Sequence, residues 1–433
     1  MSDGAKDQVR TFVRHAVERL RERGQGVAAY RGVALYDTRK DETFTSLDSF
    51  PAASDALAEL PHFEERYGDA ERTRQALQFV YRVLAGLTEP EFSEQVFEHV
   101  WTDFAEELTE PTWTYLGVTN LTSITVESDP LTLGDGLVIR GRSLDDLRAM
   151  GFPDAVIQRL SGDWMEDFGA ASSYVLLVED HVEKSPDTVV LTASPVLATK
   201  AHRLLGALRL AAPGAAGFGR LYVHRVARFE AGLGGWSATG MPRSAIFASP
   251  EYHLSDMVAS DAIKLYEDLH HLEQRGYGVG PGNLDLALQS FMISYDRSPF
   301  TFQAVLVDLV TALEALLGTD AELKFRLAFR VAGLLAATDA ERVSVFQDIK
   351  RYYGIRSKIV HGSPLKPAEH ERLRDVESFR AYVRRLLRAG VHLAASEGHG
   401  YGKEFWESRL DDTLLDAGAR AKLQRTMALA PDD

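Results

Sequence analysis

The residues best suited to chemistry lie in one segment near the carboxyl end of the chain, ERVSVFQDIKRYYGIRSKIVHGSP. This segment places Arg356 five residues before His361, and Gly362 and Pro364 follow as a helix stop. Arginine offers a planar fork of donors that fits phosphate oxygens, and histidine exchanges a proton near pH 7. The pair is a minimal set for cleaving RNA without a metal. A base takes the 2′-hydroxyl proton, the oxygen attacks phosphorus, and the guanidinium stabilises the developing charge.

The helical pattern of this segment makes Arg356 unusual. Phe346, Ile349, Tyr353 and Val360 recur at helical spacing and predict an apolar stripe, and Arg356 falls on that stripe. An arginine at such a position must be paired, must extend to solvent, or must serve a site between packed helices.

A purely structural role explains the same residues. Arg356 would then pair with an acid such as Asp308 or Glu314, and His361, in the last helical turn, would interact with free carbonyl groups. Basic residues nearby favour a positive surface around the motif, although each alone is typical of a solvated helix face: Lys358, Lys366, Arg380, Arg384 and Arg388.

Together with VTALEALLG and ELKFRLAFRVAGLL upstream, the segment YGIRSKIVHG resembles the HEPN superfamily, and within it the ApeA-like branch. The resemblance runs from Leu284 to about Gly390. More weakly, LTLGDGLVIRGRSLDDL and AHRLLGALRLAAPG are similar to the regions that precede the HEPN module in ApeA-like proteins.

The resemblance implies a helical bundle that is commonly dimeric, with a motif of Arg, four to six residues, then His. It implies a metal-independent endoribonuclease without a cofactor, in which Arg356 binds the scissile phosphate and His361 is the catalytic acid or base. The cleft would form where two protomers of a homodimer bring their motifs together. Residues expected to support this site are Ser357, Lys358, Glu314 and Tyr353. Many active members carry Asn, Asp or His directly after the motif arginine, and this chain departs from that pattern at Ser357.

The family analogy also suits an anti-phage or abortive-infection effector that acts on RNA. Residues 1–245 would then sense a phage-derived or nucleotide trigger or restrain the ribonuclease. The alternative is a non-catalytic HEPN module that binds RNA, nucleotide or a partner protein, with Arg356 and His361 retained for ligand contact or dimer packing. A third interpretation is a plain helical interaction protein.

Composition limits the remaining choices. The chain has 433 residues, 45% hydrophobic and 26% charged, which is typical of globular proteins. It has no cysteine, which excludes disulfides, thiolate zinc sites, iron–sulfur clusters and cysteine nucleophiles. The net charge of −15 argues against a protein that coats duplex nucleic acid over its whole surface. Charge is uneven, however: Asp320 to Gly390 holds 15 Lys and Arg against 9 Asp and Glu, so one basic module lies within an acidic chain.

No stretch approaches 18 consecutive apolar residues, and the first residues form a charged helical pattern. We therefore expect a cytoplasmic protein that does not enter a membrane.

The elements predict an α+β multidomain protein. A helical region covers 1–110, a mixed β-containing domain 111–245, an all-α HEPN-like bundle of five or six helices 250–395, and a last helix and tail 396–433. Gly134, Asp135 and Gly136 mark a hairpin, SYVLLVEDHV and RLYVHRVARFE predict strands, and GLGGWSATGMPRSA predicts a loop. The stretch 88–112 has eight carboxylates and no Lys or Arg. It predicts an amphipathic helix whose acidic face is either solvated or docks a basic partner.

Overall fold

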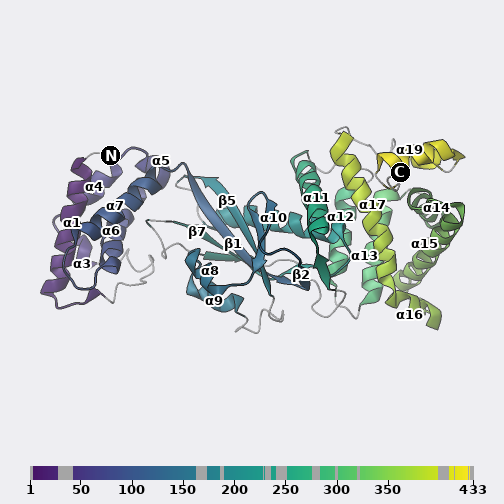
Figure 1. Ribbon diagram of the computed structural model, residues 1–433, viewed down its shortest axis with the longest axis horizontal. Helices are drawn as coiled ribbons and strands as arrows, with labels where there is room; N and C mark the ends of the chain where they lie inside the picture. Colours follow the sequence, from purple (N-terminus) through teal and green to yellow (C-terminus); the bar gives the residue numbers. More distant parts are fainter. Residues whose placement is uncertain are drawn as a thin grey trace.

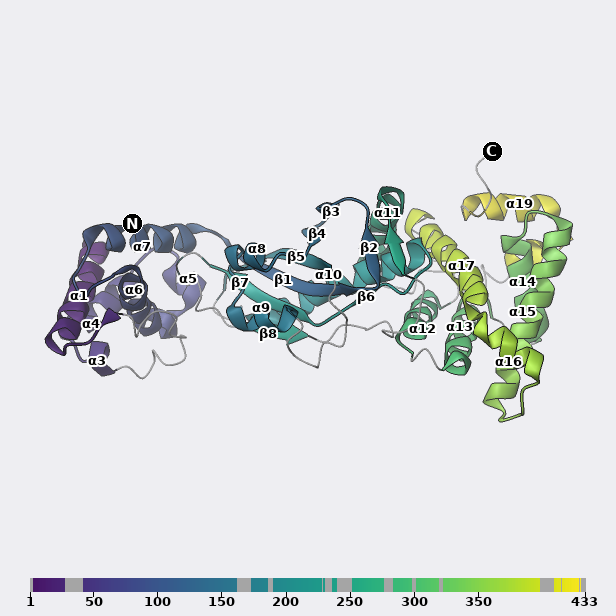
Figure 2. The same ribbon diagram turned by 60° about the horizontal axis from the view of Figure 1, so that its bottom comes forward.

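The structure, a computed structural model, has three parts in a row: a helical bundle, a β-sheet and a second helical bundle (Figures 1 and 2). It describes residues 3–27, 42–161, 173–185, 190–227, 229, 236–239, 251–275, 283–297, 301–318, 322–397, 409–413, 415–427 and 429. The expected α+β class is confirmed by the sheet and the helices on either side of it.

The first part contains only helices. They are α1 (Asp3–Glu22), α3 (Glu42–Thr45), α4 (Phe50–Ala58), α5 (Phe63–Tyr67), the short 3₁₀ helix η2 (Asp69–Glu71), α6 (Arg72–Gly86) and α7 (Glu94–Thr109). The predicted acidic helix is α7, which begins at Glu94 because the Ser93 hydroxyl caps it by accepting from the amide of Val96. Part of its acidic face serves the same bundle: Lys6 reaches Glu98 at 2.6 Å, and Arg10 reaches Glu94 at 2.8 Å.

The second part is an antiparallel sheet in the order β3-β4-β5-β1-β7-β8, with β6 paired to β1. The strands are β1 (Thr112–Thr122), β3 (Leu131–Gly134), β4 (Leu137–Gly141), β5 (Tyr174–Glu183), β6 (Gly217–Phe218), β7 (Leu221–Val226) and β8 (Trp236–Thr239). Two short helices, α8 (Leu144–Ala149) and α9 (Asp154–Leu160), pack on one face over Leu116 and Val118. On the other face lies α10 (Val190–Ala211), which approaches so closely that a Cβ at Gly117 would lie 3.2 Å from Leu197.

The predicted hairpin and both predicted strands are present as β3–β4, β5 and β7. The predicted loop GLGGWSATGMPRSA is wrong at Trp236–Thr239, which form β8. They adopt a strand because they pair with β7, Leu221 opposite Thr239, and such pairing outweighs a Gly-rich context. The other residues of that stretch lie outside the described residues.

The third part is the helical bundle. It contains α11 (Asp256–Arg275), α12 (Leu284–Asp296), α13 (Phe302–Leu317), α14 (Leu323–Leu335), α15 (Asp339–Val360), α16 (Pro367–Arg374), α17 (Val376–Glu397) and α19 (Ala417–Thr426). Between 250 and 395, then, the described residues form seven helices rather than the expected five or six, because the short α16 separates α15 from α17. Of the region 396–433, residues 398–408 lie outside the described residues.

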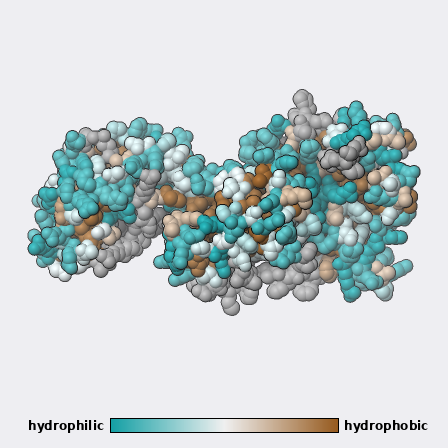
Figure 3. Space-filling view, viewed as in Figure 1, coloured by the Kyte–Doolittle hydropathy of each residue, from teal (hydrophilic) through white to brown (hydrophobic). Residues whose placement is uncertain are grey.

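The sheet and this bundle are joined in two ways. Helix α10 packs on the sheet and on α11 and α17. Strand β2 (Ile124–Val126) pairs in parallel with β9 (Tyr252–Leu254), directly before α11. In Figure 3 the visible face of the bundle is mostly hydrophilic, whereas apolar residues gather over the sheet. No helix among the described residues is long and apolar enough to cross a bilayer.

Candidate functional site

Helix α15 carries the Arg–His motif, and local signals set both of its ends. At its start the Thr338 hydroxyl accepts from the amide of Glu341 at 3.2 Å. At its end Gly362 adopts φ +69°, and the helix closes with the two backbone hydrogen bonds of a Schellman motif. The amide of Gly362 donates to the carbonyl of Ile359, and that of Ser363 to Lys358. His361 is therefore held at the C-cap, where its ring is exposed.

Arg356 forms a cluster with two residues that the sequence analysis expected to support it. Its Nη2 donates to Glu314 Oε2 at 3.0 Å, joining α15 to α13. Tyr353 lies one turn earlier, with its ring centroid 5.8 Å from the guanidinium carbon. Burial and the adjacent Glu314 carboxylate, to which its hydroxyl hydrogen-bonds, raise the pKa of Tyr353.

Of the two acids expected as partners of Arg356, Asp308 is engaged elsewhere. Its carboxylate accepts from Arg297 Nε at 2.7 Å and Nη2 at 3.0 Å. The predicted ion pair is therefore confirmed with Glu314 and wrong for Asp308. The Nε of Arg356 is buried and has no hydrogen-bond partner among the described residues.

The face of α15 that is buried differs from the predicted apolar stripe by a rotation around the helix axis. Buried side chains lie at Val345, Ile349, Tyr352 and Ile355. Val360, which was expected on the stripe, is 52% exposed. The reason is that α13 and α14 pack on this face of α15 and the Phe379 ring of α17 contacts Tyr352 there, so half-exposed aromatic residues remain on the flank. Arg356 lies at the edge of the buried face.

Ser357 and Lys358 lie on a different side of the helix from Arg356 and line a groove of about 690 Å³ between α14, α15 and α16. Lys358 Nζ contacts the Glu369 carboxylate at 2.7 Å. The other cations of the groove are Lys324, Lys350, Arg351 and Arg372. Sequence reasoning missed these four, although Lys350, Gly354 and Ser357 follow helical spacing and could have revealed one polar face.

The groove carries an excess of positive charge. Arg372 is paired with Asp348, and Arg351 approaches the same carboxylate at 3.4 Å. Lys324 and Lys350 have no ion-pair partner within the part of the chain that the structure describes. Lys324 extends across α15, since a Cβ at Gly354 would lie 3.6 Å from its Nζ. Lys350 Nζ lies 5.0 Å from the centroid of the Phe346 ring. A groove with ammonium groups that no carboxylate neutralises attracts a polyanion.

Arg356 and His361 leave the helix in different directions. At 100° and 1.5 Å per residue, five residues separate them by about 140° around the axis and about 7.5 Å along it. One copy of α15 therefore does not direct both side chains at one phosphate, whereas two copies packed together could combine an arginine from one with a histidine from the other.

The expected positive surface on the last long helix is wrong. Arg380 and Arg384 are 5% and 6% exposed and point into the bundle. Arg380 donates to the carbonyl of Ser294, and Arg384 donates to the carbonyl of Arg209 and the Tyr295 hydroxyl. They are buried because α17 is the central helix of the bundle, and their bonds satisfy carbonyls of α10 and α12.

Comparison with protein-family models, with curated proteins and with solved structures finds no match for this chain.

Proposed function

We propose that this protein is a HEPN-type endoribonuclease that cleaves RNA by attack of the 2′-hydroxyl, as the motif resemblance implies. The observation that carries the proposal is the position of Arg356. Its guanidinium is oriented by Glu314 and Tyr353, and its side chain is 22% exposed. The helix that carries it also lines the groove with the unpaired lysines. That combination suits a phosphate held at the arginine and an RNA backbone following the lysines.

The chemistry needs one proton acceptor, one proton donor and one cation. The His361 imidazole takes the 2′-hydroxyl proton, O2′ forms a bond to phosphorus, and the bond to O5′ breaks. The protonated imidazole, or its counterpart in a second copy, returns a proton to O5′. The Arg356 guanidinium stabilises the charge on the phosphoryl oxygens as the bonds exchange. The products carry a 2′,3′-cyclic phosphate and a 5′-hydroxyl.

A homodimer completes this site in the proposal, and an exposed apolar flank of α14 and α15 supports it. Phe325 and Val343 are 50% and 63% exposed, and the Phe325 ring contacts the rings of Phe329 and Phe346. Apolar surface of this kind is typical of an association face. Packing two copies through this flank would bring two α15 helices, and so two motifs, together.

Cleavage of total RNA in EDTA tests the proposal. We expect wild type to cut, and both His361→Ala and Arg356→Ala to lose at least about 100-fold in rate, since each removes one element of the chemistry. His370→Ala, which removes an exposed histidine of α16 near the groove, is the matched control and should cut like wild type. Wild-type cutting that survives in both motif variants would place the activity elsewhere.

The alternative is a module that binds RNA, nucleotide or a partner protein without cleaving. Two ion pairs favour it: Glu314 and Glu369 partly neutralise Arg356 and Lys358, as in a site built for reversible contact. Filter binding of the same RNA separates the two functions. Binding that is lost in Arg356→Ala, with no cutting by wild type in EDTA or in Mg²⁺, would support the binding module.

A further inference from the structure

Glu369, in the first turn of α16, brings a carboxylate into the positively charged groove between α14, α15 and α16. Among the described residues it is the sole acid that lines the groove, whereas five cations do so: Lys324, Lys350, Arg351, Lys358 and Arg372. Both of its oxygens contact Lys358 Nζ, at 2.7 Å and 2.8 Å. This contact lowers the pKa of the Glu369 carboxyl, so the group is ionised at neutral pH. The two non-bridging oxygens of a phosphodiester can engage an ammonium group in the same way.

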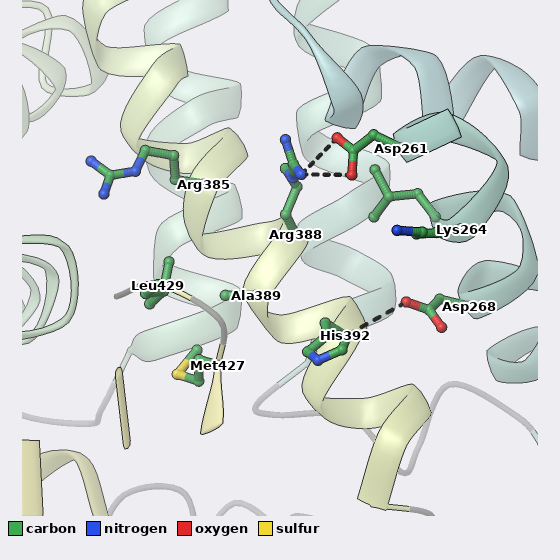
Figure 4. Close-up of a pocket in the computed structure, with 10 residues that line it drawn as sticks. Asp261, Lys264, Asp268, Arg385, Arg388, Ala389, His392, Met427 and Leu429 are labelled. Carbon is green, nitrogen blue, oxygen red and sulfur yellow. Dashed lines mark hydrogen bonds and ion pairs between the residues drawn. The ribbon is translucent and has the colours of Figure 1, made fainter. Parts of the chain in front are cut away.

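The charge balance of the groove differs from that of the pocket between α11 and α17, which has a volume of about 330 Å³. In that pocket Lys264 lies between Asp261 and Asp268 (Figure 4). Arg388 pairs with the first carboxylate, and His392 Nδ1 faces the second at 3.9 Å. Acidic and basic side chains therefore alternate there and leave no excess charge for a polyanion. In the α15 groove the cations outnumber the acid, so a polyanion is attracted and the acid competes with it.

The pair between Lys358 and Glu369 can open without disturbing α16. The two side chains are 33% and 24% exposed, so water screens their attraction. Glu369 Oε2 also accepts from the backbone amide of Lys366 at 2.8 Å, a bond that caps the first turn of α16. The Lys358 ammonium group, by contrast, ends a flexible four-carbon stem. It can turn from the carboxylate to a phosphate while the carboxylate stays at the helix cap.

A released Lys358 would lengthen the line of available lysines along α15. Lys350 lies eight residues earlier, about 12 Å along the helix axis, and lines the same groove. It has no carboxylate partner within the part of the chain that the structure describes. His361 follows Lys358 by three residues. One RNA strand could therefore contact both lysines with separate phosphates and approach the motif histidine.

We propose that Glu369 is an autoinhibitory residue of the groove: its carboxylate competes with an RNA phosphate for the Lys358 ammonium group and so weakens RNA binding. This inference rests on the proposed function, because it assigns the groove to the RNA backbone. Capping of α16 explains the bond to the Lys366 amide, but it does not require the two contacts with Lys358. Removing the charge of Glu369 while keeping its cap should therefore release one cation to the RNA.

Fluorescence anisotropy with a labelled single-stranded RNA of about 12 nucleotides and mixed sequence, in EDTA, tests the inference. All proteins are full-length and carry His361→Ala, so that the RNA stays intact. Glu369→Gln removes the charge, and glutamine still accepts from the Lys366 amide. We expect binding to tighten about fivefold at about 0.1 M salt, and the slope of log K against log salt to steepen by about 0.7, as for one added phosphate contact of a single strand.

Two controls separate this contact from a general effect of charge. Glu371→Gln makes the same change in net charge at an exposed position of α16 that does not line the groove, and it should bind like the parent. In the second control Glu369→Gln is combined with Lys358→Ala. The double variant should bind like Lys358→Ala alone, because no ammonium group is left to release.

The inference is overturned if Glu369→Gln binds RNA like the parent, or if it tightens binding equally in the Lys358→Ala background. If Lys350→Ala weakens binding while Glu369→Gln changes nothing, the groove remains the RNA site and only the autoinhibition fails. If neither the parent nor Glu369→Gln binds this RNA, the assignment of the groove to RNA fails together with the inference.

Discussion

The ion pair between Arg356 and Glu314 positions the guanidinium but contributes little to stability. The side chains of Arg356 and Glu314 are 22% and 20% exposed, and partly solvated pairs of this kind contribute about 0–1 kcal/mol. The singly charged phosphodiester of RNA can therefore displace or share the contact at little energetic cost. The carboxylate keeps the guanidinium in position until then, which a free arginine on a helix surface would not achieve.

At the residue scale the clearest pH effect belongs to His224, on β7. It is 4% exposed, contacts the Phe152 ring, and has a buried Nε2 without a hydrogen-bond partner among the described residues. Burial lowers its pKa from 6.5 to about 4, because a charged imidazolium would lose hydration there. Between pH 6.5 and 4 the unfolded chain binds this proton and the folded chain does not.

Stability should therefore fall as the pH drops through this window, by roughly 3 kcal/mol from this group at full effect. His224→Phe keeps an aromatic ring against Phe152 and removes the titration. Urea unfolding at pH 7 and pH 4.5 should show a smaller loss for this variant than for wild type, with the exposed His99→Ala as control. An equal loss in His224→Phe and wild type would contradict the assignment.

At the element scale the end of α15 is set by one glycine. Gly362 has φ +69°, a conformation that costs a non-glycine residue about 1–2 kcal/mol. This conformation allows the two Schellman hydrogen bonds that keep His361 at the helix end. Space is not the limit there, since no heavy atom lies within 4 Å of a Cβ built at this position.

A pair of glycine variants on α15 should act in opposite directions. Gly362→Ala is expected to lower the free energy of unfolding by about 1 kcal/mol through backbone strain. Gly354→Ala, within the helix, should raise it by up to about 1 kcal/mol, because alanine is the better helix former and its Cβ meets only the Lys324 amine. Denaturant unfolding of both variants measures the two signs, and destabilisation by both would refute this account of the helix end.

At the scale of the whole molecule the sheet stands between the N-terminal helices and the motif (Figure 1). The acidic helix α7 lies at the opposite end from α15, so it does not cover the motif of its own chain. The sheet does contact the bundle: Asp135, at the tip of the β3–β4 hairpin, accepts from Lys200 of α10 at 3.0 Å and from Tyr266 of α11 at 2.6 Å. A restraint by residues 1–245 would have to act through such contacts.

The proposed homodimer gives the prediction at this scale. Phe325→Glu places a charge on the exposed flank of α14 and should convert a dimer seen by light scattering to a monomer, with loss of RNA cutting. Met257→Glu, at a position 79% exposed on α11, is the matched control and should leave the dimer intact. A wild-type chain that stays monomeric at high concentration would rule out the shared cleft.

The sequence by itself determined most local structure, because periodicity, capping residues and turn glycines act over a few residues. It predicted the helix that carries Arg356 and His361, its end at Gly362, and the hairpin at Asp135. It also indicated an acid such as Asp308 or Glu314 as the partner of Arg356. Tertiary structure decided between them, because Asp308 already pairs with Arg297.

Tertiary structure also decided which charges reach solvent. The sequence predicts Arg380 and Arg384 as surface residues. Packing of α17 at the centre of the bundle instead buries them against carbonyl groups of α10 and α12. The groove beside the motif gathers Lys324 and Arg372 from two further helices. No spacing rule within one helix predicts that side chains of different helices come together, since this depends on how separate elements pack against one another.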